Sequence, residues 1–273
     1  MAESLIRKPV VDGKFYSSSA ARLKKDIEGF LDRRPEPLEA IGCLLPHAGY
    51  IYSGRVAGKT ISRLKLKATA ILLGPNHTGY GAPFSITTKG CWQTPLGTSE
   101  INTILAKGIL DKSIYLSDDA TAHAYEHSLE VQLPFLQYLR EDIQIVPIAV
   151  TEGQIAIYRK IGESIAATLK ESNTAKNALI IASSDMTHYE PQESAEKKDK
   201  AAIEAILDLD EARLINRVKA LNISMCGYVP AVIMIIAAKL LGATSAELIN
   251  YQTSGEISGD YQSVVGYAGI IIK

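Results

Sequence analysis

The sequence has little cysteine and no excess of charge of either sign. Its 273 residues include only Cys43, Cys91 and Cys226, which are odd in number and widely spaced. This pattern speaks against a disulfide framework or a paired-cysteine zinc motif. With 29 basic and 30 acidic residues, the formal net charge is -1. No basic stripe is available to neutralise phosphates, so we expect no nucleic-acid partner.

Segments that would direct the chain to a membrane are also missing. Residues 1–16, MAESLIRKPVVDGKFY, lack the apolar core of a signal peptide. The longest apolar stretch, VPAVIMIIAAKLLGA, contains Lys239 and is shorter than the roughly 20 residues that cross a bilayer. We therefore expect this stretch to be a buried helix of a cytoplasmic protein that has reduced thiols and no membrane partner.

Short apolar runs alternate with amphipathic stretches along the chain, which is typical of a layered α/β fold. Expected strands are 40–45, 68–74, 83–88, 143–150, 177–184, 247–253 and 264–272. Expected helices are 17–33, 54–65, 98–109, 127–139, 153–171, 194–208, 210–219 and 229–241. Pro134 indicates that the helix over 127–139 starts late or kinks. Since no repeat or long linker divides the chain, we expect one domain, 1–273, with a central mixed sheet flanked by helices.

Three of the five histidines follow the carboxyl ends of expected core strands. His47 follows AIGCLL, His77 follows ILLG, and His188 follows ALIIASS with Asp185 three residues before it. Ligands of open α/β sheets bind in the crevice outside these strand ends, so three loops can bring imidazoles to one place. One such histidine alone is more often structural. Their shared placement is what favours a site.

Converging imidazoles suit two kinds of chemistry. Two histidines and an anionic ligand can hold a metal ion with open coordination positions. Histidine also transfers protons near neutral pH, and Asp185 could orient the His188 ring for either purpose. Cys226 precedes an expected helix start, where a thiolate is favoured, although a core-filling role fits it equally well. We expect Cys43 and Cys91 to be small core residues.

The segment AYEHSLEVQLPF contains further titratable residues. Glu126 and Glu130 are four apart and are expected to share a helix face, either for acid–base work or toward solvent. His127 either holds this helix to the sheet or lines a pocket. His123 is expected at the surface.

Other polar side chains flank these loops. Tyrosines beside the two glycine-framed histidines could line a pocket for an aromatic or peptide ligand: Tyr50, Tyr52 and Tyr80. Near the C-terminus, SGEISGDY is typical of a turn, in which Ser254 and Asp260 either cap the backbone or reach the site.

Ordered blocks of the chain resemble the Memo family, whose archaeal and bacterial members are known as AmmeMemoRadiSam system protein B. The matching blocks are RKPVVDGKFY, PHAGYIYSG, LGPNHTGYG, EHSLEVQLPFLQ, SSDMTHY, MCGYVPAV and TSGEISGDYQSVVGYAG. Phe15-Tyr16 stands where many members have Trp-Tyr. The resemblance implies a fold similar to the LigB-type class III extradiol dioxygenases, which hold non-haem Fe(II) with two histidines and a glutamate.

In the Memo family the corresponding pocket has two histidines and a cysteine. The resemblance therefore implies that His47, His77 and Cys226 are metal ligands, and that His188, accompanied by Asp185, is the acid–base residue. A thiolate in place of a carboxylate shifts the preference toward Fe(II), Cu or Zn. It is also open to oxidation by O2.

The leading expectation is a metal-dependent, Fe(II)-type oxidoreductase that acts on an unidentified small substrate, as a dioxygenase would. One alternative is a non-catalytic module that binds metal or peptide in a vestigial pocket. A second is a zinc-dependent hydrolase, and a third is a metal-free enzyme in which His188 activates Cys226 as a nucleophile. Family association alone implies other AmmeMemoRadiSam proteins, including a radical-SAM-type protein, as partners.

Overall fold

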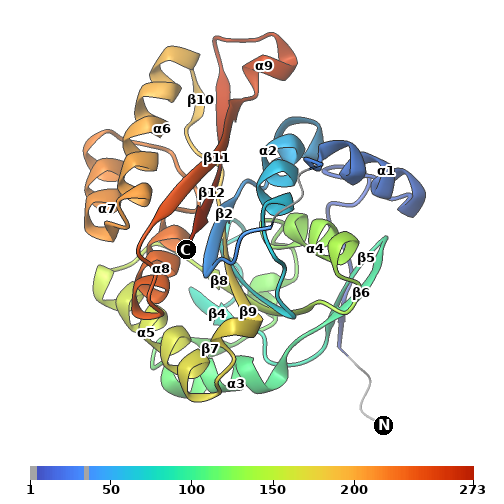
Figure 1. Cartoon of the computed structure of the whole chain (residues 1–273), viewed down its shortest axis with the longest axis vertical. Coiled ribbons are helices and arrows are strands. Elements are labelled where there is room, and N and C mark those ends of the chain that lie inside the picture. The colour runs from blue at the N-terminus through green and yellow to red at the C-terminus, as the bar shows by residue number, and fades with distance from the viewer. Residues whose placement is uncertain (1–4, 34–36) are drawn as a thin grey trace.

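A nine-stranded mixed sheet forms the centre of the protein, in a computed structural model that describes residues 5–33 and 37–273 (Figure 1). The strand order is β10-β12-β2-β9-β3-β8-β4-β7, and β11 pairs with β12. Its four central strands run parallel: β2 (Gly42–Leu45), β9 (Ala178–Ser183), β3 (Thr69–Pro75) and β8 (Gln144–Val150). Because both faces are covered, these strands are nearly continuous apolar runs rather than alternating ones.

The register of the parallel strands places their carboxyl ends side by side. Leu45 of β2 pairs with Ser183 of β9, and Ala182 of β9 pairs with Leu73 of β3. The loops that follow these strands therefore leave the sheet at one edge, as the sequence predicts.

Antiparallel strands extend the sheet on both sides. On one side lie β12 (Val264–Ile272), β11 (Ala246–Thr253) and the short β10 (His188–Glu190). On the other side lie β4 (Phe84–Ile86) and β7 (Ser117–Asp118). A separate three-stranded sheet contains β1 (Ile6–Arg7), β5 (Cys91–Thr94) and β6 (Gly97–Glu100).

Helices cover both faces of the large sheet (Figure 1). On one face α2 (Tyr50–Ser62) packs on β2, β11 and β12, with α1 (Ala20–Phe30) and α4 (Leu133–Leu139) beside it. On the other face α8 (Tyr228–Leu240) packs on β2, β3 and β9. Further helices complete this side: α3 (Thr103–Lys112), α5 (Ile155–Glu171), α6 (Gln192–Leu207) and α7 (Glu211–Ala220). A short helix, α9 (Gly255–Ser258), follows β11.

The long apolar stretch forms the central helix α8, as expected. Its residues from Tyr228 to Ala238 are all buried between the sheet and neighbouring helices, which explains why it has no polar face. Pro230 lies in its first turn, where no intrahelical partner is lost. In the described part of the chain, none of the helices is both long enough and apolar enough to cross a membrane.

The predicted α/β architecture is confirmed, with differences at short or polar segments. All seven expected strands form, but β1, β5, β6, β7 and β10 were not predicted because each spans four residues or fewer. Residues 98–100, expected to be helical, belong to β6. The helix expected over 127–139 starts late, as Pro134 suggests: a 3-10 turn over Glu130–Gln132 precedes α4. Helix α2 begins four residues earlier than expected, at Tyr50.

Candidate metal centre

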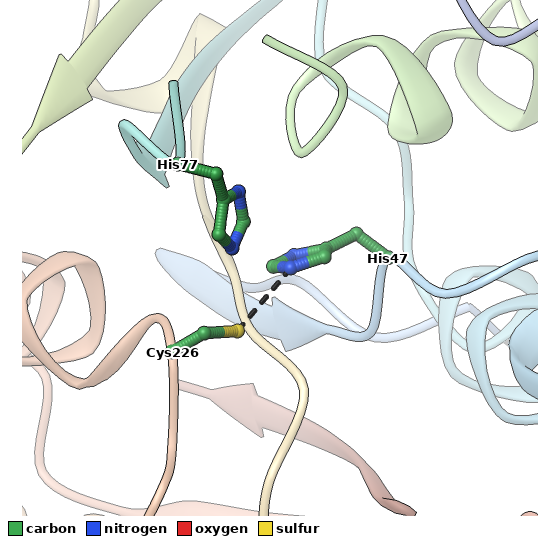
Figure 2. Close-up of side chains that lie close together, drawn as sticks. All are labelled: His47, His77 and Cys226. Carbon is green, nitrogen blue, oxygen red and sulfur yellow. Dashed lines mark hydrogen bonds between the residues drawn. The ribbon is translucent and has the colours of Figure 1, made fainter. Parts of the chain in front are cut away.

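Two imidazoles and a thiol converge at the carboxyl edge of the sheet (Figure 2). His47 follows β2, His77 follows β3, and Cys226 lies just before α8. One ligand atom from each of the three lies within 4.8 Å of the other two. Cys226 Sγ and His47 Nε2 are 3.2 Å apart.

A chain of hydrogen bonds fixes the tautomer of His47. Its Nδ1 lies 2.9 Å from the Ser183 hydroxyl, which donates its single proton to the Ser128 carbonyl at 2.7 Å. The hydroxyl must therefore accept from Nδ1–H of His47, and the lone pair of His47 is on Nε2, facing Cys226. Burial, reinforced by the neighbouring His77, holds the pKa of His47 well below its usual range. The ring is thus neutral and oriented as a ligand.

A buried carboxylate orients His77 in the same way. Glu126 is fully buried and accepts from His77 Nδ1 at 2.9 Å and from the backbone N–H of Ser128 at 2.8 Å. Burial would raise the pKa of Glu126, but its hydrogen bond and attraction to His77 lower it to about 2. The ionised carboxylate keeps the proton on Nδ1 of His77, so Nε2 is free for a ligand on the cavity side.

Close packing of α8 against β9 positions the thiol. A Cβ atom on Gly227 would lie 2.2 Å from the carbonyl oxygen of Ser183, so only glycine lets the helix begin here. The backbone N–H of Asp185 donates to Sγ of Cys226 at 3.3 Å. Burial, followed by the nearby Asp185 charge, raises the pKa of the Cys226 thiol. This raised pKa contradicts the expectation that the helix start favours a thiolate, and the thiol donates to the lone pair of His47 Nε2.

The three donors fit a soft divalent metal ion. Two neutral imidazoles and one sulfur are ligands that suit Fe(II), Cu or Zn rather than Mg²⁺ or Ca²⁺. Bonds of about 2.0–2.1 Å to nitrogen and about 2.3 Å to sulfur at tetrahedral angles place such atoms about 3.6 Å apart. The observed 3.2 Å between Sγ and Nε2 of His47 requires only a small adjustment.

Two of the candidate ligands, His47 and His77, line a cavity of about 550 Å³. His188 also lines it, and its Nδ1 lies 2.8 Å from the carbonyl oxygen of Ser224. Asp185 does not orient His188 as expected: it accepts from the backbone N–H of His47 at 2.7 Å and, among the described residues, makes no hydrogen bond with His188. The reason is that the Asp185 carboxylate points back at the loop after β2. Burial raises the pKa of Asp185 to about 6.

His127 lies in the cavity wall rather than holding a helix to the sheet. Its ring stacks on His77 with centroids 4.7 Å apart and contacts Phe15 edge-on at 5.0 Å. His77, Glu126 and His127 form a second group that could hold a metal ion. Nδ1 of His77 is already bonded to Glu126. We therefore assign Glu126 and His127 to positioning His77 as a ligand of the first group, rather than to a second metal site.

The expected tyrosines separate into different environments. Tyr52 lines the cavity. Tyr80 does not, because its exposed ring packs edge-on against Tyr125 with centroids 6.1 Å apart. Tyr50 is a core residue whose hydroxyl donates to the Val131 carbonyl. Ser254 and Asp260 both reach the cavity wall.

Two further expectations about charged groups are wrong. His123 is buried rather than at the surface, because the turn that carries it places its ring against Trp92 and its Nε2 2.9 Å from the Ser85 hydroxyl. Glu126 and Glu130 do not share a helix face, since the helix starts after them. Glu130 is fully buried and bonds Arg7 and the Tyr16 hydroxyl. Cys43 and Cys91 are buried in the core, as expected.

Sequence patterns missed several residues that shape the site. Ser183 and Ser224 orient the rings of His47 and His188, respectively. Tyr189 and Tyr267 line the cavity from β10 and β12. Amino-acid composition does not single out these serines. A polar residue at the end of a buried strand, such as Ser183, is nevertheless a pattern that could have identified one of them.

Comparison with known proteins agrees with the family resemblance that the sequence blocks indicate. The profile of a family described as Memo-like protein matches residues 7–271. A MEMO1 family protein of Methanopyrus kandleri is 43% identical, over 98% of this chain and 99% of its own. Others from Aquifex aeolicus and Methanosarcina barkeri are each 44% identical, covering 97% and 98% of this chain and 98% and 100% of their own. The chain therefore belongs to the Memo family.

Proposed function

We propose that the protein is a metal-dependent enzyme of the oxidoreductase type, with an Fe(II)-type ion held by His47, His77 and Cys226. The observation that carries this proposal is the lone pair of His47 Nε2, fixed by Ser183 and lying 3.2 Å from Cys226 Sγ. A tautomer fixed by an outer hydrogen bond is what metal-binding histidines require. The same arrangement recurs at His77 through Glu126.

The chain's own groups divide the work of binding and proton transfer. When bound, an Fe(II)-type ion supplies Lewis acidity and a redox couple. His188 is the base. Its Nδ1 faces the Ser224 carbonyl and therefore carries the proton. Nε2 is then free to accept a proton from a substrate in the cavity. Asp185 fixes the loop that carries His47, because it accepts the backbone N–H of that residue.

The placement of two imidazoles after the parallel strands β2 and β3, which lie on either side of β9, supports a relationship with the LigB-type dioxygenases, and hence an O2-dependent reaction of a small substrate. The ligand set also suits copper and zinc, and a zinc hydrolase would use the same residues. The reduced thiols of Cys43 and Cys226 support a reducing, cytoplasmic location. Other AmmeMemoRadiSam proteins are the partners that we propose from family association.

A non-catalytic module that carries metal or captures a peptide in the same cavity is the second candidate. The cavity is large enough to hold a side chain, and the exposed Tyr52 and Tyr189 line it. These two features favour a peptide as the ligand. Turnover of catechol-type substrates under O2 separates the two. Absence of turnover across a broad panel by metal-loaded protein would favour the binding module.

Metal content tests the proposal directly. Protein purified without oxygen should contain close to one equivalent of iron, and Cys226→Ser should lose it. Cys43→Ala, which alters a buried thiol of β2 outside the site, is the matched control and should retain the metal. Undiminished metal in Cys226→Ser would refute the ligand assignment. Rapid alkylation of Cys226 by iodoacetamide at neutral pH in protein without metal would instead support a nucleophilic cysteine.

A further inference from the structure

One wall of the cavity is formed by hydroxyl groups and a carboxylate. Ser254, Ser258, Asp260 and Ser263, from the segment between β11 and β12, line this wall. One carboxylate oxygen of Asp260, Oδ1, accepts the backbone N–H of Gln262 at 2.9 Å. The other, Oδ2, makes no hydrogen bond among the described residues and is free for a ligand.

Apart from four histidines, the ionisable side chains that line the cavity are carboxylates and tyrosines. Its described lining residues include two carboxylates, Asp185 and Asp260, and no lysine or arginine. Asp185 is 5% exposed, and its Oδ1 accepts the backbone N–H groups of His47 and Ala48. Asp260 is exposed and is therefore the carboxylate more accessible to a ligand, and the described lining offers no lysine or arginine to pair with a phosphate or carboxylate group.

Aromatic rings line the same cavity as this carboxylate. Phe15, Tyr52, Tyr189 and Tyr267 all line it. Tyr267 is 2% exposed, whereas Tyr52 is 37% and Tyr189 is 76% exposed, so the rings extend from the interior to the mouth.

An unusual backbone conformation directs one of these rings toward the cavity. Tyr189 has φ +59°, a conformation that bulky residues rarely adopt. It lies between His188 and Glu190, which pair with consecutive residues of β12 across an irregularity in the ladder. A bulge of this kind re-aims a side chain, and here it sets Tyr189 at the cavity.

A free carboxylate and aromatic faces, with no lysine or arginine among the described lining residues, are the chemistry that recognises an ammonium group. We propose that the cavity binds a small ligand that carries a protonated amine on an apolar or aromatic body, with the ammonium group at Asp260. This inference rests on the proposed function in one respect, since it places the ligand in the cavity that the candidate metal ligands His47 and His77 line. Phosphorylated and carboxylated ligands are disfavoured at this wall.

Three probes of matched shape test the charge preference: phenethylamine, 2-phenylethanol and 3-phenylpropionate. Their dissociation constants are measured by ligand-observed NMR on the full chain, purified without oxygen with its metal content determined, and again after chelation. In protein treated with a chelator, the amine should bind about tenfold more tightly than the propionate. This ratio is expected from an exposed ion pair with Asp260 together with ring contacts. In Asp260→Asn the amine and the alcohol should bind within about twofold of each other.

Asp142→Asn is the matched control, because this exposed aspartate lies before β8 at the opposite edge of the sheet and pairs with Arg140. It should leave the preference for the amine unchanged. Propionate binding equal to or tighter than amine binding in chelated protein would overturn the proposal. So would a preference for the amine that survives Asp260→Asn. A failure of the metal assignment appears separately, as protein without metal, and leaves the test in chelated protein intact.

Discussion

The Ser183 hydroxyl lies 2.9 Å from Nδ1 of His47, and this contact joins the end of the central strand β9 to the candidate metal centre. Ser183 also accepts from Gln132 Nε2 at 2.8 Å and donates to the Ser128 carbonyl. All hydrogen-bonding capacity of the hydroxyl is thus used. The neutral ring of His47 can adopt only the tautomer that presents its lone pair to Cys226.

Replacing Ser183 by alanine should weaken metal binding while leaving all three ligands in place. Without the hydroxyl, the His47 ring loses its partner at Nδ1, and loss of such a partner costs about 10- to 100-fold in metal affinity. Competition with a chromogenic chelator measures this. Ser172→Ala at the end of α5 is the control and should bind metal as the unaltered protein does. Equal affinity in Ser183→Ala would show that the hydroxyl does not orient a ligand.

Glu126→Gln should weaken metal binding by a similar factor of about 10 to 100 through His77. The amide keeps the shape of the side chain but loses the charge that holds the proton on Nδ1 of His77. The same chelator competition applies, with exposed Glu141→Gln as the control. If the proposal is wrong and His77 is only structural, Glu126→Gln will lower stability and leave the affinity of any bound metal unchanged.

Buried His123 should make stability depend on pH. Burial lowers its pKa to about 4, whereas the unfolded chain titrates near 6.5. The unfolded state therefore binds more protons between these values, so the contribution of His123 is complete above about pH 6.5 and is lost as pH falls through about 4. The loss amounts to about 3 kcal/mol.

Urea unfolding at pH 7, 5.5 and 4 tests this. The free energy of unfolding of His123→Gln should be lower than that of the unaltered protein at pH 7, and the difference should narrow toward pH 4. His47, whose pKa is also lowered, titrates in both proteins and does not affect this difference. A difference that stays constant across this range would contradict the burial of a neutral His123.

Gly266→Ala should destabilise the protein by about 1–3 kcal/mol, the usual cost of overpacking. A Cβ atom there would lie 1.9 Å from Oδ2 of Asp199, a buried carboxylate that accepts from Tyr251 and from the backbone N–H of Thr187. Gly29→Ala in α1 is the control, because nothing lies within 4 Å of its added methyl group. Urea unfolding measures both, and equal stabilities of the two variants would contradict the packing described.

The sequence predicts those parts of the fold that depend on local pattern. Apolar runs identify the buried parallel strands, and because parallel strands end at one edge, the meeting of the loops after β2, β3 and β9 follows from them. Helix α8 is equally predictable from the sequence, since its own residues are apolar on every face. Short strands such as β7 and β10 depend on their pairing partners and have no pattern of their own.

Orientation of side chains is what the sequence cannot supply. Asp185 is three residues from His188, and this spacing suggested a pair, yet its carboxylate serves the backbone of His47. His123 looked like a loop residue, but contact with Trp92 from β5 buries it. Such contacts join residues distant in the chain, and only the packed structure determines them.

The most direct test of the central claim is the X-ray absorption spectrum of metal-loaded protein prepared without oxygen, recorded at the edge of the metal that elemental analysis identifies. The account predicts a first shell that contains one sulfur and two imidazole nitrogens, with the sulfur signal lost in Cys226→Ser. A first shell without sulfur in the unaltered protein, or one unchanged in that variant, would contradict it.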